Sequence, residues 1–167
     1  MIKQWKKVQE SHSSILKITE GHNIVCCPTH DHKIHFKSDA KLEFASNWSL
    51  YKEIGPIIKE IRFNSCQLES LPNDFFDCLE NLEILYLNGN RLKSLPSPTN
   101  PHPLQQLYAH NNKITSLDLN NFQTLGQLSI SENPLQEFPS SLFNLSQLTV
   151  LMAGQIGLKA IPEDIAK

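Results

Sequence analysis

Six side chains of the kinds that bind zinc lie within fourteen positions near the N-terminus. They are His22, Cys26, Cys27, His30, His32 and His35. Zinc requires four ligands that converge in a tetrahedron, and the two-residue gap between Cys27 and His30 suits one half of such a site. No second pair of standard spacing follows, so the sequence favours a structure without metal, and we predict no cofactor. Zinc binding stays open as an alternative.

Nucleophilic catalysis is the other chemistry that these residues suggest. Cys26 or Cys27 could pair with His30, but the sequence specifies neither a group that orients the histidine nor an oxyanion site. The G-x-S-x-G elbow, the glycine-rich phosphate loop and the H-E-x-x-H motif do not occur. We therefore predict that the protein is not an enzyme.

A second group has the residue types that most often dominate protein interfaces, arginine and tyrosine, together with apolar and imidazole side chains. Its members are Arg62, Ile84, Tyr86, Tyr108, His110 and Met152. They are far apart in the sequence, so a repeating structure is needed to bring them to one surface.

The segment Leu82 to Pro96, LEILYLNGNRLKSLP, supplies that repeat. It follows the template L-x-x-L-x-L-x-x-N-x-L-x-x-L-P, and the same template recurs from residues 58, 104, 125 and 148. The starts are 21 to 24 residues apart. A period of this length is typical of a solenoid.

The spacing of apolar residues in this template has a physical explanation. The L-x-L residues at positions four and six point to one face of a short strand, which cannot bury that face alone. Repeats must therefore stack into a coil of parallel strands, with the connecting segments on the opposite side. The buried asparagine at position nine needs hydrogen-bond partners, and its amide suits the turns of adjacent coils. The predicted ladder is Cys66, Asn90, Asn112 and Asn133, with Ile156 unable to continue it.

Positions three, five and seven face outward along the strands. Because neighbouring strands lie about 4.8 Å apart, each position forms a continuous column, and position five brings Arg62, Tyr86 and Tyr108 together. We predict that the exposed group binds a partner protein. The alternative is that the tyrosines only stabilise packing across the strands.

The five repeats resemble the leucine-rich repeat family. The proline after the last leucine is similar to bacterial and cytosolic members, some of which are effectors delivered into host cells. The resemblance implies an α/β fold: a right-handed solenoid with a parallel sheet on its concave face, short helical or extended convex segments and an N-terminal cap. It also implies protein–protein recognition through the concave face. The ubiquitin-ligase domain of some bacterial members is not present in these residues.

Two regions are expected. Residues 1–56 form the N-terminal cap, which covers the exposed end of the solenoid core and includes a degenerate repeat at residues 39–57. Residues 58–167 form five repeats, the last incomplete. A fragment of a larger leucine-rich repeat protein is the alternative.

The composition of the chain limits the classes of partner that we expect. A net charge of −2 and a pI near 6.4 give no electrostatic basis for binding nucleic acid or an anionic membrane. No apolar run approaches the roughly 18 residues of a membrane span, and the N-terminus lacks the features of a secretory signal. We expect a cytoplasmic protein, or one exported by a system that needs no signal peptide. The sequence indicates neither the partner's identity nor the oligomeric state.

Overall fold

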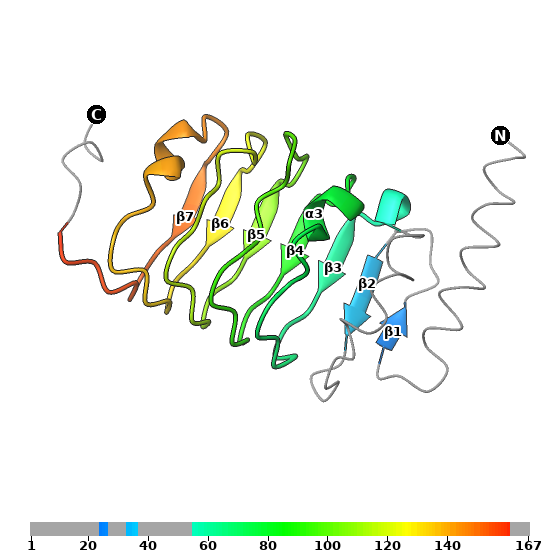
Figure 1. Cartoon of the computed structure of the whole chain (residues 1–167), viewed down its shortest axis with the longest axis horizontal. Helices are drawn as coiled ribbons and strands as arrows, with labels where there is room; N and C mark the ends of the chain where they lie inside the picture. Colours follow the sequence, from blue (N-terminus) through cyan, green and yellow to red (C-terminus); the bar gives the residue numbers. More distant parts are fainter. Residues whose placement is uncertain (1–23, 27–32, 37–54, 161–167) are drawn as a thin grey trace, which may run out of the picture.

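The fold is a row of short strands set side by side (Figure 1). The computed structural model describes residues 24–26, 33–36 and 55–160. Its strands are β1 (Ile24–Cys26), β2 (Lys33–Phe36), β3 (Glu60–Arg62), β4 (Ile84–Tyr86), β5 (Gln106–Tyr108), β6 (Gln127–Ser129) and β7 (Val150–Met152). They form one sheet in this order, in which β1 and β2 are antiparallel and all later neighbours are parallel.

The register of the sheet follows the sequence template. Ile61, Leu85, Leu107 and Leu128, the residues at position four, are paired from strand to strand and are fully or almost fully buried. Their neighbours at positions three and five lie on the other face, which is the concave face of the solenoid. The predicted leucine-rich repeat solenoid with a parallel sheet is therefore confirmed.

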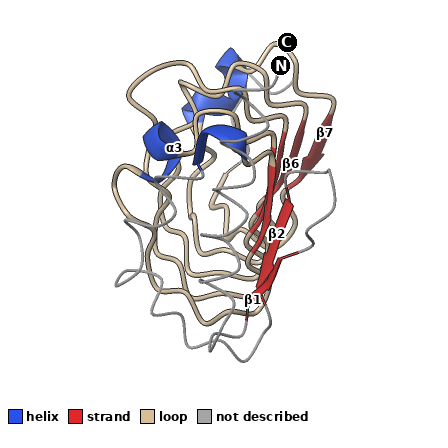
Figure 2. Ribbon diagram, turned by 90° about the vertical axis from the view of Figure 1, so that its right-hand side faces the viewer, coloured by secondary structure: helices blue, strands red, loops and turns tan. Residues whose placement is uncertain are grey.

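Short helical turns lie on the side opposite the sheet (Figure 2). They are η1 (Gly55–Ile57), α3 (Phe75–Cys78) and η2 (Ser140–Asn144). Residues 96–103 contain no helix, because three prolines after Pro96 remove backbone donors and disfavour helical geometry. The convex side is thus partly helical and partly extended, as expected.

An aromatic cluster fills the space between α3 and the middle of the solenoid. Phe76 is 1% exposed and makes edge-to-face contacts with Phe75, His102 and Phe122, at ring-centroid distances of 5.1, 5.2 and 4.9 Å. This is the geometry that aromatic quadrupoles prefer. The cluster joins residues from three successive repeats.

The imidazole of His102 is the polar member of this cluster. Its Nε2 lies 3.1 Å from the backbone oxygen of Leu79 and donates to it, while the buried Nδ1 has no hydrogen-bond partner of good geometry among the described residues. Burial lowers the pKa of His102, and the bond to Leu79 and the nearby charge of Asp77 oppose this only in part. His102 is therefore neutral in the folded protein near pH 7.

This lowered pKa predicts a loss of stability in mild acid. Unfolded His102 binds a proton near the ordinary pKa of 6.5, whereas folded His102 does so only at lower pH. Above pH 6.5 the neutral imidazole contributes fully to the free energy of unfolding. As the pH falls from 6.5 to the lowered pKa of the folded state, this contribution is lost at up to about 1.4 kcal/mol per pH unit. Urea unfolding of the wild type and of His102→Gln at pH 7.5, 6.5 and 5.5 measures this.

The difference between the two proteins isolates His102 from the other histidines. The free energy of unfolding of the wild type should fall more steeply with decreasing pH than that of the variant. Parallel pH dependence in the two proteins would contradict the buried neutral histidine.

Three asparagines lie one repeat apart in the core behind the strands. Asn90 accepts hydrogen bonds from the backbone N–H groups of Cys66 and Leu68, both at 3.0 Å, and donates to the backbone oxygens of Phe63 and Leu87. Asn112 and Asn133 repeat the arrangement one and two coils further on. Each amide therefore joins two adjacent turns of the solenoid.

The two ends of this column use apolar or weakly polar side chains. Cys66 is 1% exposed, its thiol lies 3.4 Å from the backbone oxygen of Asn64, and burial raises its pKa to about 11. The thiol is thus un-ionised and poorly reactive near neutral pH. Ile156 occupies the column in the fifth repeat and is 2% exposed, so the last position is filled by packing alone.

The turn after each strand has the same backbone geometry. Position eight adopts a positive φ in every repeat, at Ser65, Gly89, Asn111, Glu132 and Gln155. Only Gly89 has the residue type that adopts this conformation without steric cost. A shared turn places the residue at position nine, Cys66, Asn90, Asn112, Asn133 or Ile156, alike in each coil.

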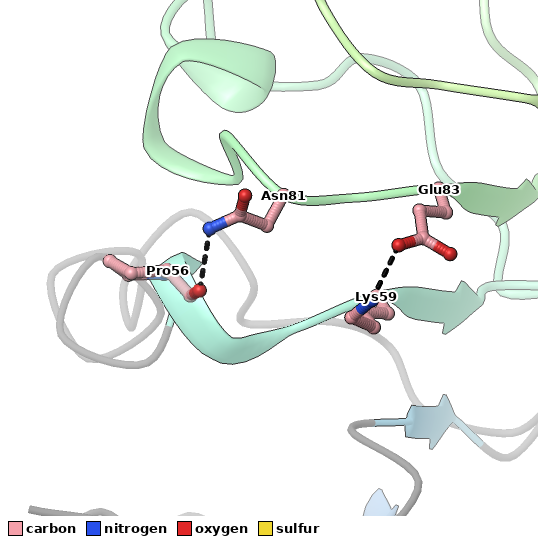
Figure 3. A network of polar contacts seen from close by, with 4 residues as sticks. All are labelled: Pro56, Lys59, Asn81 and Glu83. Carbon is pink, nitrogen blue, oxygen red and sulfur yellow. Dashed lines mark hydrogen bonds and ion pairs between the residues drawn. The ribbon is translucent and has the colours of Figure 1, made fainter. Parts of the chain in front are cut away.

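The first two repeats are also linked outside the core (Figure 3). Asn81 Nδ2 donates to the backbone oxygen of Pro56 at 2.8 Å, and Lys59 Nζ lies 2.6 Å from Glu83 Oε1. Lys59 and Glu83 are both accessible to water, so their ion pair contributes at most about 1 kcal/mol. The apolar core and the asparagines are the stronger links between coils.

Two strands of the N-terminal region extend the sheet beyond the repeats. The neighbour of β3 is β2, which pairs Ile34 with Ile61. Residues 37–54, which hold most of the expected degenerate repeat at 39–57, lie outside the described residues, as does most of the cap at 1–56. The role of the cap stays a prediction.

At the other end of the sheet, β7 has no neighbouring strand on its outer edge within the described part of the chain. Val150, Leu151 and Met152 are 41%, 39% and 45% exposed. Leu151 belongs to the core column, and its exposure reflects the end of the described stack after β7.

Candidate functional site

Three side chains from successive strands form a stacked row on the concave face. The guanidinium carbon of Arg62 lies 4.4 Å from the ring centroid of Tyr86. The rings of Tyr86 and Tyr108 are nearly parallel, at 9°, with centroids 4.8 Å apart. The distance between the rings matches the spacing of adjacent strands, because the sheet register pairs these residues directly.

Polar groups hold both ends of the row. Arg62 Nε donates to Glu60 Oε1 at 2.6 Å, and Glu60 is 3% exposed. The hydroxyl of Tyr108 donates to Gln127 Oε1 at 2.8 Å and lies 3.1 Å from Gln106 Oε1. These contacts fix the side chains in one arrangement before any partner binds, which lowers the entropy cost of binding.

Partial burial raises the pKa of the Tyr108 hydroxyl, and the neighbouring Tyr86 raises it further. Tyr108 is therefore neutral at physiological pH and remains a hydrogen-bond donor. The row thus presents two stacked rings, a guanidinium and fixed polar groups on one surface.

The remaining predicted residues lie around this row. Ile84 is half-buried on β4, one residue before Leu85, and His110 follows β5 and is also half-buried. Met152 is separated from Tyr108 by Ser129, so it stands at the open end of the sheet. The structure thus groups five of the six predicted residues and leaves Met152 apart.

Sequence reasoning missed the polar column at position seven. Asn64 Oδ1 accepts a hydrogen bond from the N–H of Asn88, Asn88 Oδ1 accepts one from His110, and Ser131 Oγ accepts one from Gly154. Glu60, Gln106 and Gln127 at position three were also missed. Aligning the repeats places both columns on the outward face, but a selection by aromatic and basic residue types passes over them.

An open groove of about 590 Å³ adjoins the concave face beside the starts of β5, β6 and β7. All of its lining residues are uncharged, and the larger ones are amides or carry hydroxyl groups. They are Gln105, Gln106, Gln123, Thr124, Gly126, Gln127, Gln147 and Thr149. The groove shares Gln106 and Gln127 with the surroundings of Tyr108.

Most of the predicted zinc ligands fall outside the described residues, namely His22, Cys27, His30 and His32. Cys26 and His35 lie on β1 and β2, which are adjacent antiparallel strands. Among the described residues no group of three or more potential ligands occurs. The described helices include none with the length and apolar character to cross a membrane.

Known proteins share the repeat. The family described as Leucine Rich repeats (2 copies) matches residues 80–121. Osteomodulin of Bos taurus is 38% identical over 103 residues, which cover 60% of this chain and 24% of osteomodulin. Lumican of Gallus gallus is 36% identical over 92 residues, covering 52% of this chain and 26% of lumican. The solved structure of the Leptospira interrogans LRR protein LIC12759 is similar with a TM-score of 0.59 and 25% identity, covering 70% of this chain and 30% of that one.

These similarities agree with the stacked strands and the repeat template described above. The chain therefore shares leucine-rich repeats with these proteins. It spans about a quarter of the length of the curated relatives that it matches.

Proposed function

We propose that this protein is an interaction module that binds a partner protein through its concave face, centred on Arg62, Tyr86 and Tyr108. The supporting observation is the pre-ordered row of one guanidinium and two rings on three adjacent strands. Arginine and tyrosine bury large areas and keep one polar end, which makes them frequent centres of binding energy. The fold is one in which repeated units build an extended binding surface.

The test compares partner capture by the wild type and by the double variant Tyr86→Ala, Tyr108→Ala. Loss of two central aromatic side chains should weaken binding at least 30-fold, since such positions commonly contribute 2 kcal/mol or more, about thirtyfold in affinity. Affinity of a captured partner is measured by surface plasmon resonance. Circular dichroism and urea unfolding establish that each variant is folded.

Phe143→Ala is the matched control, because Phe143 is an exposed aromatic residue on the convex side. It should leave affinity unchanged. A partner that binds the double variant as tightly as the wild type would show that the tyrosines serve the sheet and not recognition.

The same proposal includes a cytoplasmic location and, more narrowly, an effector-like role for a bacterial protein in a host cell. Fractionation of cells that express the protein at its natural level tests the location, and recovery in an oxidising compartment would contradict it.

A further inference from the structure

Charge is absent from a large part of the concave face. Positions three, five and seven of the four repeats from β4 to β7 contain no Asp, Glu, Lys or Arg, although these types make up 19% of the chain. The adjoining groove is also lined without charge. Glu60 and Arg62 on β3 are charged, and they are paired with each other at 2.6 Å.

Three side-chain hydrogen-bond donors on this face have no acceptor within the described part of the chain. The oxygen of Asn88 is occupied by the N–H of His110, and the oxygen of Gln127 is occupied by the Tyr108 hydroxyl. Their NH₂ groups therefore remain available. Ser131 Oγ accepts from Gly154 and keeps its own proton for donation. Three neutral donors thus stand on this face, Asn88 on the second repeat and Gln127 and Ser131 on the fourth.

The three donors favour neutral hydrogen-bond acceptors over charged ones. A carboxylate or phosphate would lose its hydration on this face without a cation to compensate it, which is costly. Neutral carbonyl oxygens carry a smaller desolvation cost and suit amide donors. An extended peptide segment presents such oxygens, because its main-chain groups are not consumed by an internal helix.

We propose that the concave face between β4 and β7 binds an extended, uncharged segment of the partner protein, whose main-chain carbonyl oxygens accept hydrogen bonds from Asn88, Gln127 and Ser131. This inference rests on the proposed function and specifies the chemistry of the partner. The half-buried rings of Tyr86 and Tyr108 and the exposed Met152 supply apolar contact along the same face.

The probe is a library of random twelve-residue peptides displayed on phage and selected on the folded wild-type protein. Enriched peptides are synthesised with a fluorophore, and their Kd is measured by fluorescence polarisation at 50 and 500 mM NaCl. The binding segments should lack Asp, Glu, Lys and Arg. Their Kd should change less than twofold with salt, because no ion pair is screened.

Two isosteric variants test the donors. Asn88→Asp and Gln127→Glu keep the oxygen that bonds within the protein, but replace the NH₂ group with a charged oxygen that repels carbonyls. Each should weaken the selected peptides at least tenfold. Asn73→Asp adds the same charge at an exposed convex position and should change the Kd less than twofold.

Several outcomes would overturn the inference. They are selection of charged peptides whose binding weakens tenfold in salt, unchanged Kd in Asn88→Asp and Gln127→Glu, absence of any enriched peptide, or binding of neutral maltohexaose in place of peptides. The double variant Tyr86→Ala, Tyr108→Ala separates the two proposals. Uncharged peptides that need Asn88 and Gln127 but not the tyrosines would support the partner chemistry and contradict the tyrosine-centred site.

Discussion

Replacement of Phe76 by alanine is expected to lower the free energy of unfolding by about 3–5 kcal/mol. Phe76 is 1% exposed and contacts the rings of Phe75, His102 and Phe122. Truncation removes the buried apolar area and leaves a cavity between three repeats that can close only in part. Against a typical total of about 5–15 kcal/mol, this change threatens folding itself.

Urea unfolding followed by circular dichroism measures the effect. Phe143→Ala is the control, since it removes the same ring from a site that is 47% exposed, and it should cost less than about 1 kcal/mol. Similar losses in the two variants would mean that the aromatic cluster is not a centre of stability.

Asn112→Leu is expected to lower the free energy of unfolding by about 1–3 kcal/mol, because buried backbone groups lose their partners while the branched shape of the side chain is kept. Leu92 N–H donates to Asn112 Oδ1 at 3.1 Å, and the amide donates to the backbone oxygens of Leu87 and Ala109 at 2.9 and 3.1 Å. Leucine can serve none of these groups.

Hydrogen exchange gives a local measurement beside the global one. The amide of Leu92 should exchange faster in Asn112→Leu, since its acceptor is gone. Asn100→Leu makes the same change at an exposed convex position and should alter neither quantity appreciably. A neutral Asn112→Leu would show that water or backbone rearrangement satisfies the turns without the asparagine.

Much of the fold could be predicted because two patterns constrain each core residue. One is the spacing within its own repeat, and the other is its match to the same position in the next repeat. The pair Leu85 and Leu87 predicts a strand by itself, and its recurrence at Leu107 and Ala109 in the next repeat indicates which strand is its neighbour. The buried asparagines follow from the same frame, since a polar residue at a core position requires internal partners. Composition and spacing were sufficient for these features.

The N-terminal strands show where a periodic frame becomes ambiguous. Ile34 and Phe36 alternate in the same way as Leu42 and Phe44, which lie in the expected degenerate repeat at residues 39–57. The structure pairs residues 33–36 with β3. A single alternation of two apolar residues cannot specify a register unless a second repeat supports it.

The candidate site was predictable in its location and less so in its chemistry. Position five gave Arg62, Tyr86 and Tyr108 directly. The contacts of Glu60 and Gln127 depend on side-chain conformations, which residue type and spacing do not determine. The donors of Asn88 and Ser131 were overlooked because a short polar residue at an outward position gives no indication of which of its atoms the backbone uses.

The hydrogen bonds of the asparagine column join residues of neighbouring coils, for example Asn112 to Leu92 and Leu87. The hydrogen bonds of this column therefore link each coil to its direct neighbours along the solenoid. A force applied to its two ends would open it from an edge, one coil after another, and each coil of 21 to 24 residues would release about 75 Å of chain. Under force, a protein with this bonding pattern should unfold in steps, while the coils that have not yet opened stay folded.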